Sequence, residues 1–277
     1  MDDSNEYAGE SRPLAGTPAG TTPAGATAAG GSVLESSDSR TGLGANRRTA
    51  RIAGLLYLVI IVTAGFSEGY VRATLLVPGD AAATAANILA SEGLFRLGIV
   101  SDLVAFSADA VVAVLLYALL RPVNRTLALI AATLRLIAHP AIASLNLLNQ
   151  YAALLLLTEG EYLTAFEPVQ LQALALFFLD AHGYGYLVAG VFFGLHLLVL
   201  GYLLYRSDLF PAVLGVLVVV AAVGYLIESL TFFLLPGYEP IATSIVLLTA
   251  VVGEVSLALY LLVRGVRGRP ATTGVTD

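Results

Sequence analysis

Six apolar segments between residues 50 and 263 constrain the fold of this chain more than any other feature. A transmembrane helix needs about 20 apolar residues to cross a hydrocarbon core of about 30 Å, and each segment reaches that length. They predict an all-α polytopic membrane bundle of six transmembrane helices, at residues 50–72, 95–119, 127–157, 183–204, 209–235 and 241–263.

The composition agrees with a membrane-embedded bundle. Hydrophobic residues make up 57% of the chain and charged residues 12%, with a mean hydropathy of +0.83. Soluble domains contain roughly 45 to 50% apolar and about 25% charged residues. No basic cluster suits a soluble nucleic-acid-binding surface, so the expected partner is the lipid bilayer and not nucleic acid. Protein partners and the oligomeric state are left open, and the lack of cysteine excludes disulfides and cysteine nucleophiles.

Both ends of the chain differ from the apolar part. Residues 1–46 are rich in Gly, Ser, Thr, Pro and Ala and hold six acidic residues against two arginines. Because they lack the large apolar side chains that would offset the entropy of ordering, they predict a disordered acidic tail. The acidic opening, with the first apolar run starting at Ile52, is unlike a secretory signal. We therefore expect a transmembrane domain at residues 47–268 and a disordered C-terminal tail at residues 269–277.

The arginines lie mainly in alternate connections between the apolar segments. Nine of them flank the side on which the first segment begins and the sixth ends: Arg47, Arg48, Arg51, Arg121, Arg125, Arg206, Arg264, Arg267 and Arg269. By the positive-inside rule this distribution predicts a protein of the cell membrane with both termini in the cytoplasm. An even number of spans also places both termini on the same side of the membrane.

The third apolar segment is the longest and carries the most polar side chains. Its 31 residues would span roughly 46 Å as one helix, so it must tilt, protrude or bend, and Pro140 supplies a cause for bending. Polar residues inside hydrocarbon are costly and turn toward protein or water. Those of this segment form one stripe: Arg135, His139, Asn146 and Gln150. The stripe is either an interhelical hydrogen-bond ladder or a route for a ligand or proton.

Acidic residues on the second segment are the expected partners of this stripe. Asp102 and Asp109 are seven residues apart and share a helix face. We predict that Arg135 pairs with Asp109 or with Asp102, because charges inside a membrane must be compensated. A path for protons or cations along these carboxylates is the functional alternative.

The fourth segment carries two histidines. His182, close to Asp180, and His196 are fourteen residues apart, which places them roughly 21 Å apart on one face of an unbroken helix. They cannot bind one metal ion together. Glycines at positions 183, 185, 190 and 194 favour close helix packing here, while Asp180 and His182 are candidates for a site near the outer mouth.

Two more acidic residues stand in apolar surroundings, Glu228 in the fifth segment and Glu254 in the sixth. Each is a candidate for proton relay or for a hydrogen bond to a neighbouring helix.

Two connections have patterns of their own. After Val77, Asp80 is a good N-cap for an Ala-rich helical turn that runs to Ala90. Residues 171–179 predict either an interfacial helix or an extension of the fourth span.

Several phrases occur together and in order in one prokaryotic family: VRATLLVPGDAAATAANILASEGLFRLG, LLYALLRPVNRTLALIAATLRL, HGYGYLVAGVFFGLHLLVLGYLLYRSDLFPAVLG and GEVSLALYLLVRGVRG. With them the chain resembles the integral membrane proteins called domain of unknown function 4386, over about residues 47–268. The resemblance implies a multi-span protein of the cell membrane without an established activity, cofactor or catalytic residue. The chain departs from the family's expected pattern at His139 and Pro140.

Three function classes fit these residues. Transport or proton coupling, with the buried charges as exchanging partners, comes first among the specific roles, and a non-enzymatic role is favoured. A membrane-embedded metal-dependent hydrolase using His and Asp is the enzyme alternative, but no His-x-x-x-His or His-Glu-x-x-His spacing occurs. A haem held by His139 and His196 meets the same objection. A sensory or assembly factor with polar groups used only for packing is the third class. No cofactor, metal ligand or catalytic residue is predicted.

Overall fold

The computed structural model of the chain describes residues 28–158 and 160–267, and every regular element in these ranges is helical. The chain divides into two units, residues 1–40 and 41–277, and the bundle belongs to the second. Part of the predicted N-terminal tail, residues 1–27, and the whole of the predicted C-terminal tail, residues 269–277, lie outside the described residues. From Ala28 onward the chain is already helical, within α1.

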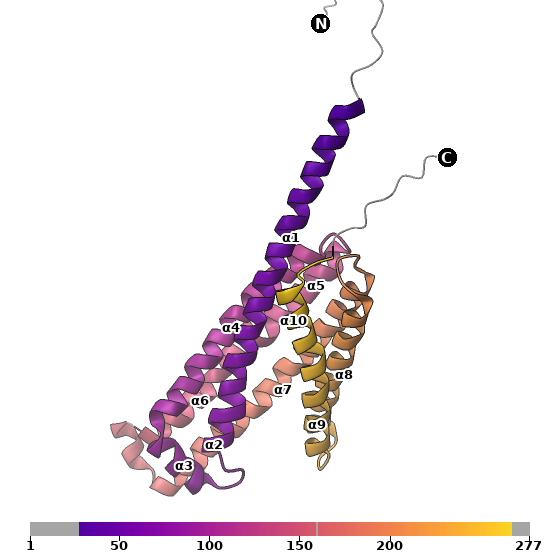
Figure 1. The fold of residues 1–277 in the computed structure, drawn as a ribbon. Coiled ribbons are helices and arrows are strands. Elements are labelled where there is room, and N and C mark those ends of the chain that lie inside the picture. The colour runs from indigo at the N-terminus through magenta and orange to yellow at the C-terminus, as the bar shows by residue number, and fades with distance from the viewer. Residues whose placement is uncertain (1–27, 159, 268–277) are drawn as a thin grey trace, which may run out of the picture. The chain divides into compact units, whose positions relative to one another are not determined.

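The expected six spans are confirmed in number and type. Six helices are long and apolar enough to cross a membrane, at Asn46–Leu75, Glu92–Leu120, Arg125–Thr158, Pro168–Arg206, Ala212–Leu234 and Glu239–Val263. They run up and down in succession (Figure 1). The protein is therefore a multi-pass membrane protein built only from helices in its described part.

Several spans consist of more than one element. The first comprises the end of α1 (Ala28–Ala64), η1 (Gly65–Arg72) and α2 (Ala73–Leu75). The second is α4 (Glu92–Leu120), and the third joins α5 (Arg125–Leu136), η2 (Ile137–Ala143) and α6 (Ser144–Thr158). α7 (Pro168–Arg206) and α8 (Ala212–Leu234) are single helices. The sixth joins α9 (Glu239–Ala250), η4 (Val251–Val255) and α10 (Ser256–Val263).

The connection after the first span folds as its sequence predicts. α3 (Ala81–Ala90) begins after Asp80, whose side chain accepts a hydrogen bond of 2.9 Å from the backbone N–H of Ala83. This cap satisfies one of the free N–H groups of the first turn. A short 3₁₀ helix, η3 (Glu161–Ala165), stands in the connection after α6.

The fourth span starts fifteen residues before its predicted boundary at residue 183, so that boundary is wrong. Pro168 opens α7, and Glu167 and Gln170 form a reciprocal capping box around it. Proline suits the first helical position, because its missing N–H would lack a partner there anyway. The helix runs on without a break through Gly183, and residues 171–179 extend the fourth span.

Three of the six spans contain a π-helical stretch: η1, η2 and η4. Such stretches are rare, and they occur frequently at functional sites. In η2 the cause is Pro140, which lacks the N–H that an α-helix would use. The backbone N–H of Ser144 reaches back five residues to the carbonyl of His139. At Pro140, where the sequence offered a cause for bending, the third span thus contains π-helical turns.

α7 lies at the centre of the helix packing, in contact with α5, η2, α6 and α8 (Figure 1). It approaches α8 closely at two glycines: a Cβ at Gly201 would stand 2.8 Å from the carbonyl oxygen of Gly215. Small residues let helix backbones come together in a membrane, where packing and not water exclusion drives association. The largest apolar core includes leucines of α4 and α7 near Arg121 and Arg206.

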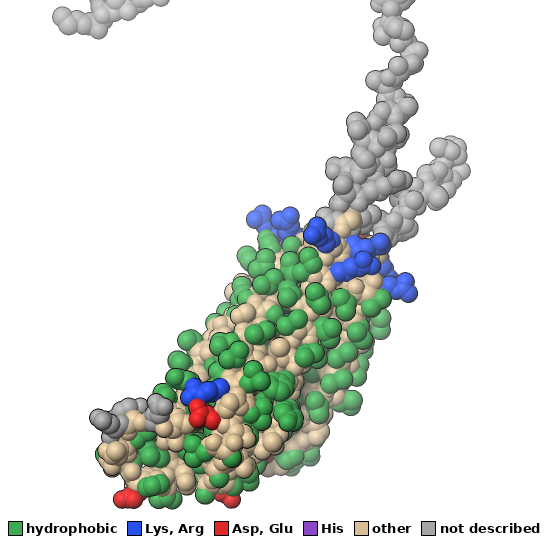
Figure 2. All heavy atoms as spheres, turned by 60° about the vertical axis from the view of Figure 1, so that its left-hand side comes forward, with side chains coloured by type: hydrophobic (Ala, Val, Ile, Leu, Met, Phe, Trp, Pro, Cys, Tyr) green, Lys and Arg blue, Asp and Glu red, His purple; other side chains and the backbone are tan. Residues whose placement is uncertain are grey.

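The surface separates into an apolar belt and a basic end. Figure 2 shows hydrophobic side chains over the middle of one face and arginines gathered at one end. We call it the arginine-rich end. Its arginines lie on α1, at the start of α5 and at the C-terminal ends of α4, α7 and α10: Arg47, Arg48, Arg51, Arg125, Arg121, Arg206 and Arg264. Such a distribution suits helices that face lipid along their length.

Candidate functional site in the membrane interior

Arg135 is the hub of a buried polar cluster midway along the bundle. Its side chain is 1% exposed, and its Nη2 donates a hydrogen bond of 2.5 Å to Oδ1 of Asp109. Nη1 donates to the Tyr57 hydroxyl at 2.8 Å and contacts Nε2 of His196 at 3.1 Å. The guanidinium also lies over the rings of Tyr57 and Phe193, at 4.7 and 5.2 Å from their centroids. Of the two pairings predicted for Arg135, the structure contains the one with Asp109.

The contact with His196 fixes the tautomer of that histidine. A guanidinium can only donate hydrogen bonds, so Nε2 of His196 must accept. The proton then lies on Nδ1, which donates to the backbone carbonyl of Ala131 at 2.8 Å. His196 is therefore held as a neutral ring by α5 on both of its nitrogens.

His139 is held less tightly than His196. Its Nδ1 stands 3.5 Å from Oδ2 of Asp109, and this carboxylate oxygen has no hydrogen-bond partner. The imidazole packs against Phe193 at 4.5 Å between ring centroids, and against Phe106 at 5.9 Å. Asp109 thus presents one oxygen to a fixed cation and the other to a titratable ring. We call Tyr57, Asp109, Arg135, His139 and His196 the central cluster.

A second polar cluster lies nearer the end opposite the arginine-rich end. His182 is fully buried, and its Nδ1 donates to the backbone carbonyl of Asn146 at 3.1 Å. Its Nε2 therefore accepts from the Gln150 amide, also at 3.1 Å. The Asn146 amide donates in turn to the carbonyl of His182 at 2.7 Å. The polar stripe of the third span and the histidine of α7 thus face one another.

The π-helical stretch η1 adds charged groups to this second cluster. Ser67 donates to Oδ2 of Asp102 at 2.7 Å, while Oδ1 of the buried Asp102 has no partner. Glu68 pairs with Arg72 at 3.0 Å and lies 4.0 Å from Nε2 of His182. We call the set of Ser67, Glu68, Arg72, Asp102, Asn146, Gln150 and His182 the outer cluster.

Tyr186 of α7 stands between the two clusters. Its ring centroid is 5.7 Å from that of His182 and 6.1 Å from that of His139. Arg72 of the outer cluster also lines a cavity of about 450 Å³. The other residues that line this cavity include Asp180, Gly183, Tyr184 and Phe232. Asp180 is exposed there and belongs to neither cluster.

Two predicted candidates lie outside both clusters. Glu254, half-buried on η4, accepts a hydrogen bond of 2.7 Å from the Tyr225 hydroxyl. The ring of Tyr225 packs edge-on against Phe193, which touches the central cluster. Glu228 is half-buried on α8 beside Thr243 of α9. Glu254 therefore borders the central cluster, and Glu228 is kept apart from it.

The comparison with known families agrees with the resemblance seen in the sequence. The model of the family described as Domain of unknown function (DUF4386) matches residues 52–265, which include most of the first span and all of the other five. The chain belongs to this family. An uncharacterized protein of Archaeoglobus fulgidus is 35% identical to it over 161 residues, 57% of this chain and 76% of the relative. No solved structure matches the chain.

Metal binding was a further possibility for this DUF4386 protein. In residues 28–158 and 160–267, no three His, Asp or Glu side chains converge in a way that would hold a metal ion. His182 and His196 each use both ring nitrogens within the protein, and Arg135 lies against the central cluster's carboxylate. Neither His182 nor His196 therefore has a ring nitrogen free to bind a metal ion in this structure.

Several residues in or beside the two clusters were not singled out by the sequence. Tyr57, Tyr186 and Phe193 are aromatic residues in apolar helices, a pattern that packing alone explains. The sequence does indicate an ion pair between Glu68 and Arg72, because they are opposite in charge and four residues apart near the end of a span. Glu68 lies 4.0 Å from Nε2 of His182, a contact across two spans that the sequence does not indicate.

Proposed function

We propose that this DUF4386 protein is a proton-coupled membrane transporter whose protonation site is the central cluster. The observation that carries the proposal is the position of Asp109. One of its oxygens is bound by Arg135, and the other is free of hydrogen bonds 3.5 Å from His139. Ionisable residues inside a membrane protein commonly mark proton relays or ion pathways.

The outer cluster supplies the approach to this site. Glu68 lies 4.0 Å from His182, and Tyr186 stands between His182 and His139. The ring separations exceed hydrogen-bond length, so proton transfer along this row requires intervening water. The cavity that Arg72 helps to line is the entrance that we propose for this row.

The other half of the bundle is closed by apolar side chains. Leu116, Leu119 and Leu120 of α4 pack with Leu200 and Leu203 of α7, and none of them is more than 3% exposed. They separate the central cluster from the arginine-rich end. A protein with a polar approach on one side and an apolar closure on the other matches one conformation of an alternating-access cycle.

Protonation of His139 is the event we expect to drive the change of conformation. The central cluster holds Arg135 and Asp109, whose charges cancel, so a proton on His139 leaves the buried site with one uncompensated positive charge. That charge would draw Oδ2 of Asp109 toward His139 and compete with Arg135 for the carboxylate. A shared carboxylate is a bistable element that a proton biases.

The arginine distribution supports an orientation for this transporter. With the arginine-rich end in the cytoplasm of a cell membrane protein, both termini are cytoplasmic and the cavity beside Arg72 faces the other side. Protons would then reach the central cluster from outside the cell.

The proposal is tested by proton movement in liposomes. The full chain is reconstituted with pyranine trapped inside, and valinomycin imposes an inside-negative potassium potential. We expect the lumen to acidify faster than in protein-free liposomes, and Asp109→Asn to return the rate to the protein-free level. Glu92→Gln is the matched control, because Glu92 pairs with Arg96 at 2.6 Å on the surface of α4.

Two outcomes would contradict the proposal. One is a wild-type rate no higher than that of protein-free liposomes. The other is an Asp109→Asn rate equal to the wild-type rate in protein that elutes as a single species in detergent. The second result would assign the cluster to helix packing, as in a sensory or assembly factor.

A further inference from the structure

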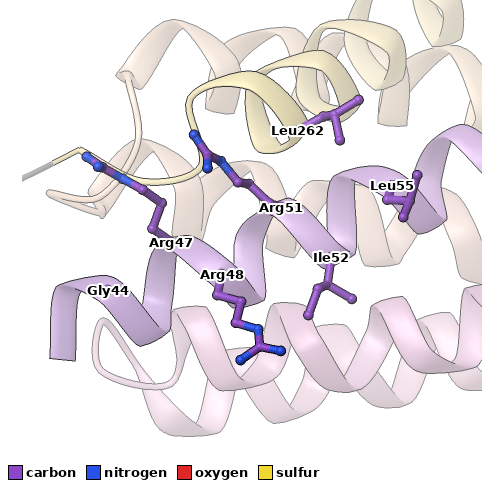
Figure 3. Close-up of a pocket in the computed structure, with 7 residues that line it drawn as sticks. All are labelled: Gly44, Arg47, Arg48, Arg51, Ile52, Leu55 and Leu262. Atoms are coloured by element: carbon purple, nitrogen blue, oxygen red, sulfur yellow. The ribbon is translucent and has the colours of Figure 1, made fainter. Parts of the chain in front are cut away.

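A second cavity lies at the arginine-rich end, far from both polar clusters. It measures about 380 Å³ and is lined by Arg47, Arg48 and Arg51 of α1 together with Gly44, Ile52, Leu55 and Leu262. Figure 3 shows the three arginines along the first turns of this stretch, with Ile52 and Leu55 following deeper along the helix. The cavity thus joins a strongly cationic rim to an apolar wall.

The ion pairs found among residues 46–158 and 163–267 involve other side chains than the arginines of this rim. Within these residues, Arg51 contacts the carbonyl of Val263 at 3.4 Å. All three side chains are exposed. Three neighbouring cations create a strong attraction for an anion.

The cavity is bounded by closely packed backbone segments. A Cβ at Gly54 would stand 2.8 Å from Cα of Leu262, so α1 and α10 touch backbone to backbone just below the rim. Gly265 then turns with a positive φ of 73° and passes over the stem of Arg47. The backbone N–H of Arg267 donates to the carbonyl of Leu209 at 2.9 Å and holds this turn in place.

The residues below the rim continue along one face of α1. Arg48, Ile52 and Leu55 follow one another at intervals of four and three residues, which places them in a row. Ile52 is 42% exposed and Leu55 is 53% exposed, on a helix that crosses the membrane. The cation at the start of this row suits the phosphate of a lipid head group. The exposed aliphatic side chains that follow it suit an acyl chain.

We propose that this cavity is a specific binding site for an anionic phospholipid. Its phosphate lies between Arg48 and Arg51, and one acyl chain follows Ile52 and Leu55 toward the middle of the membrane. Basic pockets between membrane helices bind anionic head groups in this way. The apolar wall favours a lipid over a free phosphate ion, which would gain nothing from Ile52 and Leu55. This inference is independent of the transport proposal.

Native mass spectrometry of the full chain in detergent tests the site. Wild-type protein is titrated with phosphatidylglycerol and, separately, with phosphatidylcholine of the same chain length. We expect tighter binding of phosphatidylglycerol, and about 30-fold weaker binding by the double variant R48Q/R51Q. That factor corresponds to about 1 kcal/mol for each lost basic residue near a membrane surface.

The control variant is R121Q/R125Q, which removes two exposed arginines from the same end but outside the cavity. It should bind phosphatidylglycerol within about threefold of wild type. Ile52→Asn leaves the charge unchanged and should also weaken phosphatidylglycerol binding, because it interrupts the apolar row. If R48Q/R51Q does not elute as a single species, Arg48→Gln alone should weaken binding about fivefold.

Three results would overturn the proposal. Equal weakening by the two double variants would mean a diffuse attraction to the basic end. Equal binding of phosphatidylcholine would remove the role of the negative head group. Displacement of phosphatidylglycerol by inorganic phosphate at about equal concentration would identify a free-anion site. Persistence of the lipid in excess phosphate, together with loss in Ile52→Asn, supports the lipid.

Discussion

Replacing Asp109 with asparagine should destabilise the protein more than any other single isosteric change in the described bundle. The change keeps the shape of the side chain and removes its charge. Arg135, 1% exposed, is then left as a buried cation without a counter-charge. Removing one partner of a buried ion pair costs about 3 to 5 kcal/mol, because the remaining charge has lost its compensation.

The surroundings of Arg135 set the expected value at the lower end of that range. The Tyr57 hydroxyl and His196 still accept hydrogen bonds from the guanidinium, and two aromatic rings still lie against it. The oxygen of the new amide also accepts from Nη2. We therefore expect Asp109→Asn to lower the free energy of unfolding by about 3 kcal/mol.

A double-mutant cycle separates the ion pair from other effects of the substitution. Arg135→Met removes the cation and keeps much of the volume, and the variant D109N/R135M carries neither charge. We expect the double variant to be more stable than the sum of the single losses by at least about 2 kcal/mol. The measurement is equilibrium unfolding by SDS in mixed micelles, followed by circular dichroism. A loss below about 1 kcal/mol for Asp109→Asn, or additive losses in the cycle, would refute the argument.

Two further predictions concern packing and orientation. Gly54→Ala should lower the free energy of unfolding by about 1 to 3 kcal/mol, since the new methyl group meets the backbone of Leu262. Gly183→Ala, where no atom lies within 4 Å of the new group, should be neutral or slightly stabilising; equal losses would contradict the close contact. Because the chain has no cysteine, Pro122→Cys and Tyr238→Cys can be labelled singly in intact cells. An impermeant maleimide should label only Tyr238→Cys, and the reverse pattern would invert the proposed orientation.

The features that were predictable from sequence depend on local chemistry. The six spans follow from apolar length, and the start of α3 follows from the side chain of Asp80. Arg135 needed a carboxylate, and the second span offered two on one face. The choice of Asp109 over Asp102 depends on how α4 and α5 are rotated against each other, and that rotation is a property of packing.

The features that escaped prediction depend on long-range contacts. Tyr57 is one of 13 tyrosines, and it is distinguished only by lying opposite Arg135, 78 residues away. The fourth span was predicted to start at residue 183, and residues 171–179 were left open as an interfacial helix or as an extension of that span. The capping box at Glu167 and the burial of Ala175 and Leu179 against neighbouring helices make these residues an extension.

The π-helical stretches connect the architecture to the proposed function. In lipid, a regular α-helix pairs its backbone N–H and C=O groups in hydrogen bonds within the helix. Departures from the regular helix therefore persist only where the surroundings enforce them. All three departures coincide with polar side chains that belong to the two clusters or border them: Glu68 in η1, His139 in η2 and Glu254 in η4. Proline explains only the second. A bundle that used its polar groups for packing alone would have no need to interrupt three spans at these side chains. Their coincidence therefore favours a protein in which the direction of these side chains matters and changes, as proton-coupled transport requires.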